Sequence, residues 1–265
     1  MTFAWTTFAA VSEPPSPGPA DFNLPPIFEI GEFGVTKPMV LVVLSAVIAF
    51  GVMYAMARQA AVVPSRMQFA GESVYGFVKG VARDNIGSAE YMKYVPYLFT
   101  IFLFVLVNNY FGIIPFIQFP TMSRIGYVVA IAGIAWLVYN IAGIIKHGFF
   151  GYLKHQTVPA GIDGPILVLL VPLEFFSNIV VRPFTLILRL FATMFAGHLL
   201  LILFALGGEY LLLSSDNAFA IPGGILSVLM AIVISFLEML IMFLQAYVFT
   251  LLTAMYIGTA ISEEH

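Results

Sequence analysis

The sequence predicts an all-α polytopic membrane protein with about five membrane-crossing helices, one interfacial amphipathic helix, and a long, tilted helical hairpin at the C-terminal end. The first reason is composition. Of the 265 residues 61% are hydrophobic and 9% charged, and the mean hydropathy is +0.99. A soluble domain carries about 25% charged residues, so this chain cannot cover a water-facing surface. The second reason is that the apolar residues gather in tracts of about 20 residues or more, the length that crosses a bilayer.

Three apolar tracts have the length of single spans: residues 39–56, 94–119 and 125–145. Two later tracts, residues 165–206 and 225–261, hold about 40 residues each, or roughly 60 Å as helices. That is about twice the apolar thickness of a bilayer. No cluster of turn-forming residues divides either tract. We therefore predict two long helices, strongly inclined to the bilayer normal and joined through residues 207–224.

Residues 57–93, between the first two spans, predict an amphipathic helix at the membrane surface. Ser65-Arg66-Met67-Gln68 resembles a capping box at its start. Apolar residues then recur at helical spacing, opposite polar ones, from Met67 to Arg83. A solvated loop is the alternative interpretation.

The basic residues predict the orientation. Five lie in residues 57–93 and two in residues 146–155, against Lys37 and Arg124 on the other side. The positive-inside rule then places the N-terminus outside and, after five crossings, the C-terminus in the cytoplasm. Residues 1–36 contain no Lys or Arg and are rich in Pro, so we expect an extended arm outside the membrane. Residues 37–265 then form a single membrane domain.

Several classes of chemistry have no residues to support them. The chain has no cysteine, its four histidines lack metal-ligand spacing, and it contains no phosphate-binding or dinucleotide-binding glycine motif. A net charge of −3 without a Lys/Arg cluster gives no sign of nucleic-acid binding. We expect no cofactor, no metal and no enzyme activity from this chain by itself. His147, His155 and His265 read as ordinary polar residues.

Charged residues inside the last two tracts are the candidates for function. Arg189 lies near the middle of its tract, where a charge costs at least about 2.5 kcal/mol and by default marks a polar pathway. Arg182, seven residues earlier, lies on nearly the same helical face. Four more polar residues extend this stripe at spacings of three, four or seven: Glu174, Asn178, Thr185 and Thr193.

The last tract carries a matching set of polar residues. Its one carboxylate is Glu238, and its stripe also includes Ser235, Gln245 and Tyr256. A structural ion pair is the alternative to a pathway, and for Arg182 the partner would be Glu174.

These residues resemble one family. Residues 181–198, VRPFTLILRLFATMFAGH, resemble the RPFTLxxRLFANMxAGH signature of ATP synthase a subunits, and residues 244–256, LQAYVFTLLTAMY, resemble their LQAYVFxxLTxxY segment. PLEFFSN (172–178) and NNYFGIIP (108–115) fit as well. Residues 94–96 and 146–149 resemble actinobacterial members. The resemblance covers residue 37 to the C-terminus.

The chain departs from the family pattern at a few positions. Thr193 replaces the usual Asn, so the role of that amide falls to a hydroxyl or to nothing. Gly112 stands where some members place an Asp. His198 and Glu238 occur in other members in exchanged order, which suggests that the two side chains face each other.

The resemblance implies a stator proton channel of the Fo sector in a bacterial plasma membrane, coupling proton flow to ATP synthesis. Its partners would be the c-subunit ring, the b subunits of the peripheral stalk, other ATP synthase subunits and membrane lipid. Arg189 is the essential arginine that prevents a proton leak and prompts deprotonation of the ring carboxylate. The remaining residues divide by position: His198, Glu238 and Gln245 in the outer half-channel, Glu174 and Asn178 in the inner one, and Arg182, Thr193, Ser235 and Tyr256 as supporting polar groups.

Two other classes of function stay as alternatives. A secondary transporter for a small anion could use Arg182 and Arg189 as ligands, and it predicts internal repeats. The Arg-bearing tract has no such repeat. An intramembrane enzyme would need a nucleophile and base, and no convincing pair is present.

Overall fold

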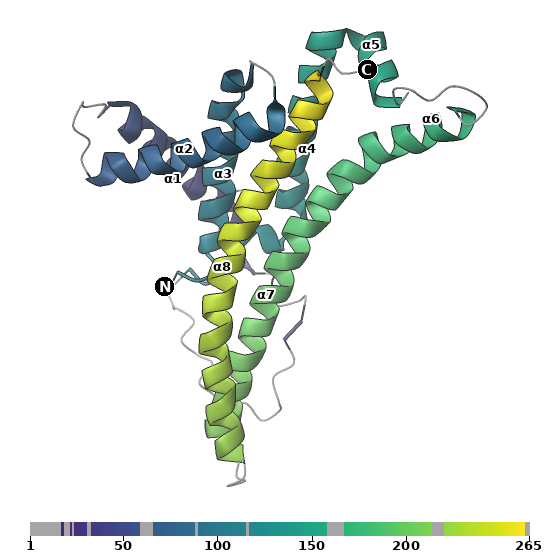
Figure 1. The fold of residues 1–265 in the computed structure, drawn as a ribbon. Helices are drawn as coiled ribbons and strands as arrows, with labels where there is room; N and C mark the ends of the chain where they lie inside the picture. Colours follow the sequence, from purple (N-terminus) through teal and green to yellow (C-terminus); the bar gives the residue numbers. More distant parts are fainter. Residues whose placement is uncertain are drawn as a thin grey trace.

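The computed structural model describes residues 17–18, 22, 24–30, 33–58, 66–87, 90–114, 117–157, 167–213 and 220–262. Within these ranges the chain is almost entirely helical (Figure 1). The helices are α1 (Lys37–Arg58), α2 (Arg66–Ile86), α3 (Val95–Tyr110), α4 (Ile125–His147), α5 (Phe149–Thr157), α6 (Leu167–Phe176), α7 (Arg182–Leu213) and α8 (Ala220–Ile261), with short turns η2 (Tyr91–Lys93) and η3 (Thr121–Ser123) and the π-helical η4 (Ser177–Val181).

The prediction of an all-α polytopic membrane protein is confirmed. Four helical stretches are long and apolar enough to cross a membrane, and α3 is a shorter apolar helix. The four are Lys37–Met56, Ile125–His147, Leu169–Leu213 and Ala220–Ile261. The expected crossing elements are therefore all present as helices. Only the second predicted span, residues 94–119, differs clearly in length from its helix, α3.

The second span ends earlier than predicted because polar contacts turn the chain back. The sequence predicts a span of residues 94–119, whereas α3 stops at Tyr110. Asn108 Nδ2 donates to Ser45 Oγ of α1 at 2.6 Å, and Thr121 Oγ1 donates to Asn108 Oδ1. The Phe119 backbone N–H then donates to the Phe111 carbonyl. These contacts fold the described residues 111–114 and 117–124 back against α1 and α3.

The amphipathic segment forms a helix, which excludes the solvated-loop alternative over Arg66–Ile86. In Figure 1, α2 runs crosswise to α8. Val78 and Ala82 are buried against the other helices, while Phe69 is largely exposed. Ser65 of the expected capping box lies outside the described residues. A location of α2 at the membrane surface stays a prediction.

Part of the N-terminal arm is paired rather than simply extended. β1 (Pro26–Ile30) and β2 (Phe33–Thr36) form a two-stranded antiparallel sheet that leads directly into α1. Most of the preceding residues of the arm lie outside the described ranges. Phe22 is described and is buried.

The two long helices of the predicted hairpin are present. A single bent helical stretch is formed by α6, η4 and α7 in succession (Figure 1). α8 runs alongside α7, and the two helices separate at the end of α7 that is nearer α6. Glycines allow the close approach: a Cβ added at Gly208 would lie 2.9 Å from Val228 Cγ2, and one at Gly224 would lie 2.6 Å from Leu212 Cγ. Residues 214–219 of the expected connection lie outside the described ranges.

The irregular turn η4 has a local cause. Proline lacks the N–H that would bond to the carbonyl four residues earlier, so Pro183 leaves the carbonyl of Ile179 without that donor. Trp136 of α4 donates its indole N–H to this oxygen at 3.2 Å. The Trp136 side chain of the neighbouring helix α4 thus supplies a hydrogen-bond donor to the irregular turn between α6 and α7.

Candidate functional site

Arg189 lies on the outside of the chain. It is exposed, and within the part of the chain that the structure describes it makes no hydrogen bond or ion pair. Its neighbours along the same face of α7 are Leu188, Ala192 and Ala196, which are also exposed. A charged group on an apolar helix face needs a polar partner. This face is therefore open to a partner molecule that presents a group of opposite charge.

His198 and Glu238 are brought together inside the chain. His198 Nδ1 of α7 lies 3.8 Å from Glu238 Oε1 of α8, and the side chains are only 6% and 3% exposed. Neither that nitrogen nor either carboxylate oxygen has a hydrogen-bond partner among the described residues. Buried charges normally have partners. Two ionisable groups so placed are suited to holding and passing a proton.

A polar cavity of about 200 Å³ opens beside His198. Sequence reasoning missed two polar residues that line it, Lys37 and Gln118. Lys37 Nζ donates to the Ile117 carbonyl at 2.6 Å, and Gln118 adopts a φ of 41°, a left-handed conformation uncommon outside glycine. No periodic pattern could identify either residue, because Gln118 lies in the folded return after α3 and Lys37 meets that return only through its contact with Ile117. The full lining is Phe22, Leu24, Lys37, Ile117, Gln118, Phe119, His198 and Ile202.

Gln245 lies two turns further along α8 than Glu238, about 10 Å at 1.5 Å per residue. Its side chain is buried. Between the two, Asn109 of α3 donates to the Met242 carbonyl at 3.3 Å. A Cβ at Gly112 would lie 2.8 Å from Met242 Cε, so an Asp at that position does not fit without a shift. α8 thus carries buried polar groups at successive depths.

A second polar cluster joins α5, α6, η4 and α7. Asn178 Nδ2 donates to Glu174 Oε2 at 3.3 Å and to the Gln156 carbonyl at 2.7 Å. A cavity of about 160 Å³ lies among these groups. Its lining is His155, Gln156, Glu174, Asn178, Arg182 and Thr259.

Arg182 does not form the structural ion pair with Glu174 that was the alternative to a pathway. No such pair lies within 4.0 Å among the described residues. The Arg182 guanidinium instead lies over the ring of Tyr256, 5.3 Å from its centroid, and Nη1 is buried without a hydrogen bond. Tyr256 in turn contacts Tyr139 edge to face. Both predicted supporting residues therefore border the second cluster.

The hydroxyls of Thr193 and Ser235 are engaged within their own helices. Thr193 Oγ1 donates to the Arg189 carbonyl at 2.8 Å, and Ser235 Oγ donates to the Ala231 carbonyl at 2.8 Å. Neither proton is free for another partner in this arrangement. The donor capacity of the family's usual amide is thus not replaced by Thr193.

The two polar cavities lie on opposite sides of Arg189 along the sequence of α7. They share no lining residue, and Arg189 lines neither. His198 lies nine residues beyond Arg189, about 13 Å along a helix. Asn178 lies eleven residues before it. The exposed guanidinium therefore separates two buried polar regions.

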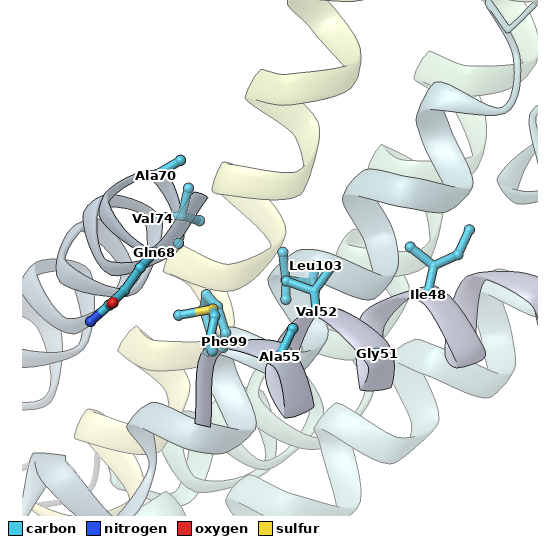
Figure 2. Close-up of a pocket in the computed structure, with 11 residues that line it drawn as sticks. Ile48, Gly51, Val52, Ala55, Gln68, Ala70, Val74, Phe99 and Leu103 are labelled. Atoms are coloured by element: carbon cyan, nitrogen blue, oxygen red, sulfur yellow. The ribbon is translucent and has the colours of Figure 1, made fainter. Parts of the chain in front are cut away.

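A large apolar cavity lies elsewhere. It measures about 640 Å³ and lies among α1, α2 and α3, where side chains such as Val52, Val74 and Leu103 surround it (Figure 2). Gln68 is its one polar lining residue, and no ionisable side chain faces it. This cavity is unsuited to passing an ion.

Together, the helices and the two clusters define a polytopic membrane protein with ionisable residues buried between its long helices. Residues 39–258 match the family model described as "ATP synthase A chain". The chain belongs to this family, as the motifs of its last two helices predict.

Relatives with this description cover almost the whole chain. "ATP synthase subunit a" of Nocardioides sp. is 60% identical over 260 residues, covering 94% of each chain. The protein of the same name from Paenarthrobacter aurescens is 47% identical over 250 residues, covering 94% of this chain and 93% of the relative. That of Streptomyces lividans is 40% identical over 254 residues, covering 95% and 89%. The similarity to actinobacterial members is confirmed, and nothing in these matches supports the anion transporter.

Proposed function

We propose that this chain is the stationary proton-channel subunit of an F-type ATP synthase. Protons cross it through two offset half-channels, and between them each rides on a carboxylate of a rotating ring of c subunits. The observation that carries the proposal is Arg189, exposed and unpaired in the described chain, between two separate buried polar clusters. Nucleotide chemistry belongs to other subunits of the complex.

The chemistry of a guanidinium suits the gap between half-channels. Arg189 stays protonated at any relevant pH and cannot relay protons. It favours the ionised form of an approaching ring carboxylate, because an opposite charge nearby lowers a carboxyl pKa by about 1–3 units. The small side chains of Ala192 and Ala196 on the same exposed face leave room for a partner helix to approach closely.

The outer half-channel runs from the cavity beside His198 to the level of Arg189. Water reaches Lys37 and Gln118 in that cavity, and His198 takes a proton from it. Glu238 accepts the proton across the 3.8 Å contact. Gln245 lies nearer the depth of Arg189 and completes the path along α8. An imidazole titrates near neutral pH, which suits it to this step.

The inner half-channel begins on the other side of Arg189. Glu174 accepts a proton released from the ring and passes it into the cavity that it shares with Asn178 and Arg182, while Asn178 positions the carboxylate by donating to it. The positive-inside distribution of basic residues supports a cytoplasmic location for this end and an outer location for the N-terminus. The partners are the c-subunit ring and the b subunits of the peripheral stalk, in a bacterial plasma membrane.

Replacing Arg189 by Ala tests the proposal. The side chain makes no hydrogen bond or ion pair within the described chain that the change could break, so we expect the complex to assemble. ATP-driven proton pumping into membrane vesicles should be lost, and passive proton leak should rise. Leu203→Ala, another exposed position of α7, is the matched control and should keep pumping. An Arg189→Ala complex that pumps at the parental rate would refute the proposal.

A further inference from the structure

Two histidines to which the sequence assigns no role lie against each other beside the inner cluster. His147 is the last residue of α4 and His155 lies on α5. Their rings are stacked, with centroids 5.0 Å apart and planes inclined by 19°. Both side chains are partly exposed. Two imidazole rings, side chains that can both accept and donate a proton, thus occupy one place on the surface.

His155 also lines the inner cavity with Glu174, Asn178 and Arg182. The pair therefore touches both the surface and the polar interior. A cavity of about 160 Å³ has room for several waters, since each needs about 10–15 Å³ of such space and polar partners. A water chain can thus connect His155 to the Glu174 carboxylate.

α5 is held at this position by its own contacts. The Tyr152 hydroxyl donates to Asn140 Oδ1 at 3.0 Å and accepts a bond from Gln156 Nε2 at 2.8 Å. Burial raises the pKa of the Tyr152 phenol above its ordinary value, so the hydroxyl remains a donor. Gly143 lets the ring pack directly on α4, because a Cβ there would overlap Tyr152 Cε2. The helix that carries His155 is therefore anchored to α4 and, through Gln156, to Asn178.

Charged residues of both signs surround the two histidines. The charged residues on the elements packed around it are Lys146 on α4, Lys154 on α5, Glu174 on α6 and Arg182 on α7. The carboxylate attracts a positively charged imidazolium and the three cations repel it. Two imidazolium rings with centroids 5.0 Å apart would also repel each other. The pair is thus suited to hold about one proton and to exchange it readily.

We propose that His147 and His155 form the proton-collecting group at the cytoplasmic end of the inner half-channel, an inference that rests on the proposed function. During ATP-driven pumping, a proton from cytoplasmic water adds to a ring nitrogen of the neutral pair. The pair then releases one proton through cavity water to the Glu174 carboxylate and returns to its neutral form. During synthesis, the same transfer runs in reverse. Each passage moves one proton and leaves every residue unchanged.

The test uses His155→Gln and the double variant His147→Gln/His155→Gln in the whole complex. ATP-driven pumping is measured in vesicles in dilute buffer, across the neutral pH range, and again with added imidazole as a diffusible proton donor. We expect pumping to fall several-fold in dilute buffer, most at alkaline pH where free protons are scarce, and to recover with imidazole. Leu153→Ala, a change at an exposed apolar position of the same helix, should pump like the parent at every imidazole concentration.

The outcomes separate this inference from the proposed function. Parental pumping by both histidine variants in dilute buffer would overturn the collecting role and leave the half-channels intact. A loss that imidazole does not restore, and that is equal at every pH, would mean a packing role for the rings and would also overturn it. Arg189→Ala, tested alongside, should stay inactive with imidazole present. Pumping by that variant would instead overturn the proposed function itself.

Discussion

His198 and Glu238 provide the sharpest test of the outer half-channel. Their side chains come from different long helices and meet beside the cavity that Lys37 and Gln118 line. Replacing either residue by Ala removes one ionisable group of the relay and leaves the other buried alone. We therefore expect His198→Ala and Glu238→Ala each to lower proton flux without uncoupling it from ATP hydrolysis.

The geometry sets the size of the coupling between the two residues. Unit charges 3.8 Å apart interact by about 4 kcal/mol at an effective dielectric constant of about 20. That value applies to a fully charged pair, and residues in direct contact typically couple by about 0.5–3 kcal/mol. We expect a coupling of about 1–3 kcal/mol, which corresponds to about 5–150-fold in flux.

A double-mutant cycle measures this coupling. Purified complexes are reconstituted into liposomes, and ATP-driven and passive proton flux are recorded for the parent, the single variants His198→Glu and Glu238→His, and the exchanged double variant His198→Glu/Glu238→His. The exchange again places an imidazole next to a carboxylate. Its flux should exceed the product of the two single defects, because each new residue meets a partner of the type it needs.

Ser235 supplies the matched control for the cycle. It lies one turn from Glu238 on α8, and its hydroxyl is bonded to its own helix. The double variant His198→Ala/Ser235→Ala should therefore show the product of its two single effects. If the exchanged pair also gives only that product, His198 and Glu238 act independently and cannot form a relay.

Three further predictions concern how the helices are held. A methyl group at Gly258 would overlap the Asn85 carbonyl oxygen of α2. Gly258→Ala should therefore lower the free energy of unfolding by about 1–3 kcal/mol and reduce the amount of this chain in purified complex. Gly51→Ala, where the added methyl group meets open space, should change neither. Asn108→Leu removes the contact with α1 and leaves the Thr121 hydroxyl without its acceptor, and should lower the thermal unfolding temperature by an amount equivalent to about 1–3 kcal/mol. Trp136→Phe leaves the carbonyl before the α6–α7 bend without its indole donor and should cost about 1 kcal/mol in the same assay, with pumping retained; parental stability would contradict the assigned role.

Much of the fold could be predicted because the hydrophobic signal acts along single helices. The spans and the two long helices of the hairpin need only a count of apolar residues, and the structure has helices over each of those tracts. α3 ended earlier than predicted for a different reason. Its stop depends on Asn108, whose partners lie 63 and 13 residues away in the sequence. Contacts of that kind leave no periodic trace.

The residues of the candidate site also divide into those that the sequence could predict and those that it could not. Arg189, His198 and Glu238 stand out in sequence because a charge is rare inside an apolar tract. Lys37, Gln118 and His155 lie outside such tracts or at their ends, where polar residues are common. Only the folded return after α3 and the packing of α5 place them beside the buried clusters. Sequence reasoning consequently found residues of the two long helices and missed the residues that line the cavities with them.

The angular positions of the polar groups on α7 explain why the outer path must change helix. A helix turns about 100° per residue, so nine residues separate Arg189 and His198 by about two and a half turns. The two side chains therefore point to opposite faces, and the structure accordingly exposes Arg189 and buries His198. A proton held by His198 cannot reach the exposed face along α7 alone. Glu238 and Gln245 lie buried along α8 in the direction of Arg189, so the second helix provides the route between the two faces of the first.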